Sequence, residues 1–71
     1  MAVIVGVLTG LSVRTKTGWY ELVPDRDSII EDIKQMQGKR IIVYGEVFVE
    51  RISSLNIELK FIEARKIKPV F

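Results

Sequence analysis

The side chains best suited to binding chemistry lie between residues 39 and 51. Lys39 and Arg40 open this segment, and Tyr44, Phe48 and Arg51 follow. At the two-residue period of a β-strand, Arg40, Tyr44 and Phe48 share one face. The opposite face is apolar, with Ile41, Val43, Val47 and Val49. Cations beside aromatic rings on a single exposed face are typical of surfaces that hold phosphates and stack bases.

The composition excludes the usual tools of most enzymes. The chain has no Cys and no His, and therefore no disulfide, no thiol nucleophile, no thiolate metal site and no imidazole base. Four carboxylates gather at Asp25, Asp27, Glu31 and Asp32. A divalent-cation site or an acid–base pair is the alternative there, but favourable interaction with the start of a helix accounts for all four. We expect a binding protein, not an enzyme, with no cofactor and no metal.

The distribution of charge says more than its formal sum of +2. Arg14 and Lys16 flank an expected hairpin loop, and Arg65, Lys66 and Lys68 crowd the end of the chain. An ordinary solvated surface is the alternative interpretation of these cations. A polyanionic partner and a solvated surface both stay open from the charge distribution alone.

Alternating and turn-forming residues predict the elements of the first half. Residues 2–13 have valines at odd positions and read as one long strand, bent at Gly6 and Gly10. Residues 15–18 form a hairpin loop in which Gly18 supplies the positive φ. The next strand, residues 19–23, places Trp19 with Glu21 on its wetter face.

A single helix is predicted from about Asp27 to Gln37. Ser28 followed by Glu31 has the spacing of a capping box, and Gly38 stands where a left-handed C-cap is wanted. Ile29 and Ile33 lie at helical spacing on the face expected to dock on the sheet.

The second half predicts two more strands. The central strand should bend at Gly45, and residues 52–56 should form the last turn. In the final strand the apolar residues change from odd to even positions after Phe61, which predicts a bulge near Phe61 and Ile62. Pro69 should end regular pairing. Residues 70–71 should then fold back onto the barrel or meet a neighbouring chain.

These elements predict one domain, residues 1–71, of mainly β class: a small, partly open barrel in ββαββ order. The run from Trp19-Tyr20-Glu21-Leu22 through the helix to residues 38–47 resembles small OB-fold domains that bind single-stranded nucleic acid. That fold needs a fifth strand, which splitting a bent strand at Gly6, Gly10 or Phe61–Ile62 would supply. Otherwise a ββαββ arrangement completed by dimerisation describes the chain.

The resemblance implies binding of single-stranded nucleic acid by stacking bases on aromatic rings within a basic groove. The residues expected to serve are Arg14, Lys16, Trp19, Lys39, Arg40, Tyr44, Phe48 and Arg51. Glu46 and Glu50 share the stripe of Tyr44 and would repel phosphates. The alternative is a structural or protein-interaction module, in which Tyr44, Phe48, Ile4 and Leu8 form a homodimer or partner interface.

The remaining composition bears on location. The uncharged run of residues 1–13 lacks a basic leader and is too short to span a bilayer, so we expect a cytoplasmic protein without membrane contact. The hydrophobic content of 48% favours a dense core or a covered surface. Abundant Ile, Val, Glu and Lys would also suit a thermophilic source.

Overall fold

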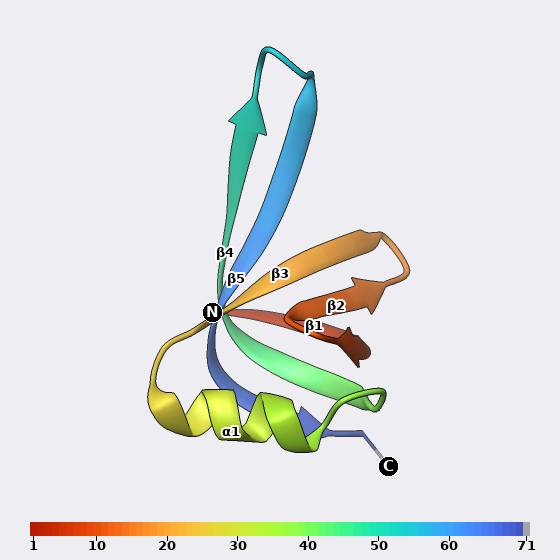
Figure 1. Cartoon of the computed structure of the whole chain (residues 1–71), viewed down its shortest axis with the longest axis vertical. Coiled ribbons are helices and arrows are strands. Elements are labelled where there is room, and N and C mark those ends of the chain that lie inside the picture. The colour runs from red at the N-terminus through yellow and green to blue at the C-terminus, as the bar shows by residue number, and fades with distance from the viewer. Residues whose placement is uncertain (71) are drawn as a thin grey trace.

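The computed structural model describes residues 1–70 and consists of a small β-barrel, one helix and a projecting hairpin (Figure 1). The elements are β1 (Ala2–Thr9), β2 (Ser12–Thr15), β3 (Gly18–Pro24), α1 (Asp27–Gln35), β4 (Arg40–Ile52) and β5 (Ile57–Pro69). The prediction of a mainly β protein with one helix between β3 and β4 is confirmed.

The barrel is closed, with the strand order β1-β2-β3-β5-β4 and β4 pairing back onto β1. All neighbours are antiparallel except β3 and β5, which run parallel. A closed five-stranded barrel with a helix between β3 and β4 is compatible with an OB-like fold. The expected ββαββ order gains a strand because residues 2–13 form two strands rather than one.

The turn at Gly10 makes the fifth strand. Gly10 has a φ of 62°, a left-handed conformation that glycine adopts without strain. The chain reverses there, and Leu8 of β1 lies opposite Val13 of β2, both fully buried.

The reversal also fixes which face of β1 points inward, and it corrects one prediction. Ile4 and Leu8 were expected to face outward in a self-association surface. Leu8 instead lies in the core and Ile4 packs against it, while the odd-numbered valines, among them Val3 and Val5, face solvent. Both faces of this segment are apolar, so periodicity alone could not choose between them.

The core fills the barrel and the space beneath the helix. Ile29 and Ile33 are the buried residues of α1. The helix lies across the end of the barrel opposite the projecting β4–β5 hairpin (Figure 1). Burial of each large aliphatic side chain contributes about 1.5 to 3 kcal/mol. The buried apolar residues are Leu8, Val13, Leu22, Ile29, Ile33, Ile41, Val43, Ile62, Ala64 and Ile67.

The helix begins two residues earlier than a Ser28 cap would require. Arg26 is the N-cap residue, with extended backbone and no side-chain capping hydrogen bond, so the predicted capping box does not form. The helix ends at Gln35 and Met36 is the C-cap; Gly38 has the expected positive φ, 77°, but lies beyond the cap in the loop.

The predicted bend at Gly45 is present, whereas the predicted bulge lies elsewhere. The register between β4 and β5 shifts after Tyr44: Tyr44 is opposite Lys66 and Gly45 is opposite Ala64, which leaves Arg65 as the extra residue. A side chain at position 45 would collide with the carbonyl group of Glu63. The bulge therefore accompanies this close approach rather than the change of phase at Phe61 and Ile62.

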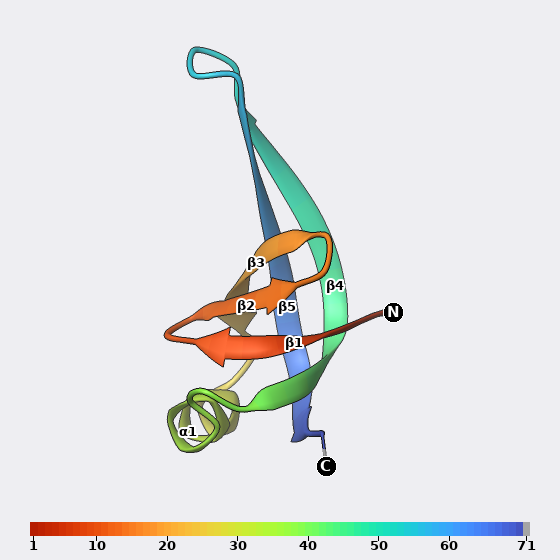
Figure 2. The ribbon, with the colours of Figure 1, turned by 90° about the vertical axis from the view of Figure 1, so that its right-hand side faces the viewer.

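Beyond Gly45 strand β4 pairs with β5 alone, and the two strands continue into a projecting arm, residues 46–61 (Figures 1 and 2). The arm is two-stranded from Val49 to Lys60, because Phe61 at its base still pairs with Glu21 of β3. Its turn includes Asn56, with a φ of 52°, as expected for the last turn. The arm accounts for the elongated shape, with extents of 38 × 24 × 21 Å. At the other end of β5, Pro69 ends the pairing, and the N–H of Val70 donates to the carbonyl of Arg40 at 2.9 Å. The expectation for Phe71 lies outside the described residues.

Replacing Gly45 by Ala should lower the free energy of unfolding by about 3 kcal/mol, because the new methyl group must push β4 away from Glu63. Urea unfolding followed by circular dichroism measures the change. Glu46→Ala, at the exposed next position, is the matched control and should cost no more than about 0.5 kcal/mol. Equal midpoints for the two variants would contradict the role given to Gly45.

Replacing Arg26 by Ser should raise the free energy of unfolding by about 1 kcal/mol, because a hydroxyl at the N-cap can accept a hydrogen bond from the first turn. Ser28→Ala tests the same point in reverse and should leave stability nearly unchanged. Thermal unfolding that shows a loss of about 1 kcal/mol for Ser28→Ala would restore the capping box.

Candidate nucleic-acid interface

A groove opens in the barrel wall between the first half of β1 and the tip of the β2–β3 hairpin. Strand β1 pairs with β2 only from Val7 to Thr9, so the hairpin tip and the first half of β1 are not hydrogen-bonded to each other. The open space has a volume of about 1090 Å³. It is lined by Val3, Ile4, Val5, Gly6, Val7, Thr9, Arg14, Thr15, Lys16, Thr17, Trp19, Tyr20 and Arg40.

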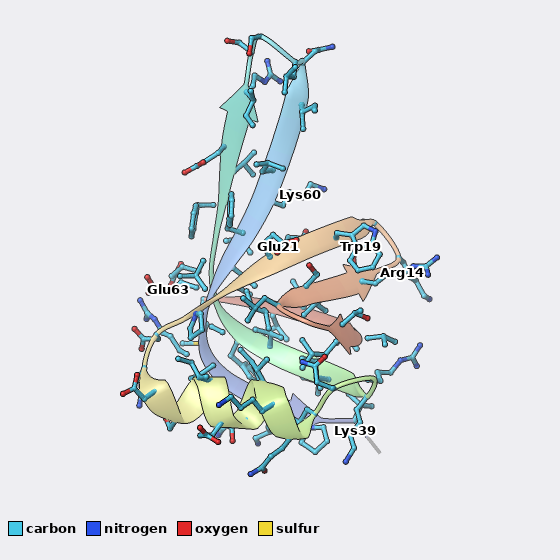
Figure 3. All side chains as sticks on the ribbon, viewed as in Figure 1. Arg14, Trp19, Glu21, Lys39, Lys60 and Glu63 are labelled. Atoms are coloured by element: carbon cyan, nitrogen blue, oxygen red, sulfur yellow. The ribbon has the colours of Figure 1, made fainter. Side chains whose placement is uncertain are left out.

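Trp19 stands on the hairpin side of this groove. Its indole is 51% exposed, and the guanidinium of Arg14 lies 5.9 Å from the ring centroid. Arg14 and Trp19 are cross-strand partners on the outer face of β2 and β3, and Figure 3 shows them together near the end of the hairpin. The cation–π contact limits the orientations of both side chains while leaving much of the indole accessible.

Arg40 reaches the same groove from a distant part of the sequence. The barrel closes by pairing β1 with β4, and Val7 is the Cα partner of Arg40 on one side and of Arg14 on the other. Directly opposed residues in neighbouring strands share a face. A row of outward side chains therefore runs from Arg40 over Val7 to Arg14 and Trp19, and Lys16 adds a third cation from the hairpin tip.

The charged side chains that line the groove are all positive. No Asp or Glu is among its lining residues. Within residues 1–70 the ion pairs use only Arg26, Lys34, Arg51 and Arg65, so none of the groove cations is neutralised there. On strand β3 the carboxylate of Glu21, two residues after Trp19, accepts a hydrogen bond from the hydroxyl of Ser12 at 2.6 Å.

Four of the eight predicted site residues line the groove: Arg14, Lys16, Trp19 and Arg40. Tyr44 lies next to it, half-buried on the outer face, where it pairs with Val3 of β1 and Lys66 of β5. Lys39 is not among the lining residues and lies in the loop between α1 and β4 (Figure 3).

The other two predicted residues belong to the arm. Phe48 stacks on Phe61 with ring centroids 5.1 Å apart, and Arg51 forms an ion pair with Glu58 at 2.9 Å. The bend at Gly45 separates them from the groove although they continue the same strand. Glu46 and Glu50, which were expected to oppose phosphate binding, are not among the lining residues of the groove.

Two sets of residues at this surface escaped the sequence prediction. The outward valines of β1, Val3, Val5 and Val7, form the apolar floor of the groove and were not among the predicted site residues. Lys66 and Lys68 lie opposite Tyr44 and Ile42 on the outer face of β5, next to the same strand pair. Their cluster at the end of the sequence was visible, but its position beside β4 depends on the bulge at Arg65.

The described residues offer little support for other chemistry. Among residues 1–70 no group of three or more Asp and Glu side chains is close enough to share a metal ion. The one helix of this part of the chain is too short to cross a membrane.

Comparison with models of protein families, with curated proteins and with solved structures gave no match, so the functional argument depends on the geometry of the groove.

Proposed function

We propose that the protein binds single-stranded nucleic acid in the groove between β1 and the β2–β3 hairpin. The observation that carries the proposal is the combination of three cations, Arg14, Lys16 and Arg40, with the exposed Trp19 and with no Asp or Glu among the lining residues of the described part of the chain. Single-strand binding proteins combine a positively charged groove with aromatic rings on which bases stack.

Each part of the groove has a distinct role in this proposal. The cations contact phosphates and release counterions, which supplies affinity without sequence preference. The indole of Trp19 stacks on an unpaired base, and the valines of β1 cover the apolar faces of neighbouring bases or sugars. Bases in a duplex are already stacked and paired, so the indole can engage only a single strand.

Titration with a fluorescent single-stranded oligonucleotide should show binding that weakens with salt. Three phosphate contacts give a slope of log K against log salt of about −2 for a single strand. Quenching of Trp19, the single tryptophan, should accompany binding. A duplex of the same sequence should bind more weakly, and absence of binding at low salt would refute the proposal.

Variants test the residues. Trp19→Ala should lower affinity by about 1 to 3 kcal/mol, whereas Trp19→Phe keeps a stacking ring and should lose less. Arg40→Ala should reduce the salt slope by about 0.7. Phe48→Ala on the arm is the matched aromatic control and should leave oligonucleotide affinity unchanged. If Phe48→Ala weakened binding as much as Trp19→Ala, the interface would include the arm.

The arm favours a second candidate function, that of a protein-interaction or self-association module. Two-stranded hairpins are marginally stable alone in water. This one nevertheless exposes a series of large apolar side chains, among them Val49, Leu55 and Ile57 at 52%, 64% and 43%. A partner or a second copy that covered the arm would remove this apolar surface from water.

Light scattering over a wide concentration range separates the two uses of the arm. Self-association predicts a mass above 8.1 kDa that returns to 8.1 kDa in Phe48→Ala. A mass of 8.1 kDa for the parent at all concentrations would exclude the homodimer and leave only a different partner for the arm.

A further inference from the structure

Strand β1 has a free hydrogen-bonding edge inside the groove. Its pairing with β4 runs without interruption from Ala2 to Val7, but its pairing with β2 begins only at Val7. Among residues 1–70, the part of β1 from Ala2 to Gly6 is therefore paired with another strand on one side only. Unpaired strand edges are templates for the addition of another strand.

The direction of each backbone group follows from Leu8. Its N–H donates to the carbonyl of Lys39 at 3.0 Å, and its carbonyl accepts from the N–H of Gly38 at 2.8 Å. The backbone N–H and C=O groups of Leu8 therefore point to the β4 side of the strand. The direction of the N–H and C=O groups alternates along a strand. Even-numbered residues of β1 therefore direct these groups toward β4, and odd-numbered residues direct them toward β2. Val7 is the last odd residue paired with β2.

Val3 and Val5 consequently direct their N–H and C=O groups into the groove. Neither residue makes a backbone hydrogen bond to the hairpin within residues 1–70. Their side chains point to the outer surface and are 56% and 48% exposed. The edge offers two donors and two acceptors at the spacing of a β-ladder.

The groove has room for a strand. Its volume of about 1090 Å³ is at the upper end of the range of ligand sites in proteins. A strand added to β1 would lie about 4.8 Å from it, along the space in front of the hairpin tip. Inward side chains of such a strand would lie on the side of Ile4 and Tyr20, and outward ones would lie on the surface that Arg14 and Lys16 line directly and that Arg40 reaches from across β1.

We propose that the β1 edge binds an extended acidic segment of a protein partner as an added strand, with apolar residues facing Ile4 and Tyr20 and Asp or Glu facing the three cations. The positive charge of the groove favours an acidic segment over a second copy of the chain. A second copy joined through its own β1 edge would bring its Arg14, Lys16 and Arg40 to the same surface, where like charges repel. The added strand would occupy the groove and so compete with single-stranded nucleic acid. Only this competition rests on the proposed function.

A synthetic peptide of alternating Glu and Val is the probe, and a peptide of alternating Lys and Val is its charge control. We expect calorimetry to show binding of the Glu peptide alone. Hydrogen exchange should then slow at the amides of Val3 and Val5, whereas Ile4, which already faces β4, should not change. Binding of both peptides alike, of neither, or without protection of Val3 and Val5 would overturn the proposal.

Proline tests the edge itself. Val5→Pro removes an N–H that has no partner in the fold and should weaken the Glu peptide about tenfold or more, while Val5→Thr keeps the N–H and should bind like the parent. Val3→Pro, near the start of the strand, serves the same purpose if Val5→Pro unfolds. Undiminished peptide binding by a folded proline variant would contradict edge pairing.

Oligonucleotide measurements on the same variants separate this proposal from the previous one. Nucleic acid held by side chains should bind folded Val5→Pro and Val5→Thr alike, because both variants lose the valine side chain and they differ in the N–H, and it should be displaced by the Glu peptide. If an oligonucleotide, rather than the peptide, protects Val3 and Val5, the edge belongs to nucleic acid and the peptide proposal is wrong. If the protein alone shows protected Val3 and Val5 with a doubled mass, a second copy occupies the edge and the proposal also fails. Absence of oligonucleotide binding would remove the proposed function without affecting the peptide result.

Discussion

The close approach of Gly45 to the backbone of Glu63 is the constraint on which the rest of the structure depends. Strand β4 pairs with β1 as far as Gly45 and with β5 alone after it, so one position ends the barrel wall and begins the arm. The bulge at Arg65 completes the arrangement. Ile62 and Ala64 face the core before it, and the extra residue lets Ile67 face the core after it. Without the bulge, regular alternation would turn Lys66 inward.

Features determined by neighbouring residues were predictable from sequence. The hairpin loop ending at Gly18, the bend at Gly45, the position of the helix and the exposed face of Trp19 all depend on local backbone preferences and short-range patterns. The inward face of β1 was not predictable, because its two faces are almost equally apolar. The choice is made by the turn at Gly10 and by pairing with β4, which are properties of the assembled barrel.

The same division applies to the candidate site. Arg14, Lys16 and Trp19 are close in sequence and belong to one hairpin, so their association follows from the predicted loop. Arg40 joins them only because barrel closure places it across Val7 from Arg14. Phe48 was assigned to the same stripe because two-residue periodicity reports which face a side chain occupies. Periodicity does not report that the strand changes direction, and the bend at Gly45 takes Phe48 to the arm.

The distribution of charges has a consequence for the whole molecule. Within residues 1–70 the groove cations form no ion pair, whereas the arm carries Arg51 and Lys60 as well as Glu50 and Glu58, and the acids around α1 lie among Arg26 and Lys34. A net charge of only +2 therefore conceals a local excess of positive charge at the groove. If the groove binds a polyanion as proposed, this excess would turn the barrel wall toward it during approach, an effect that fades as added salt shortens the Debye length.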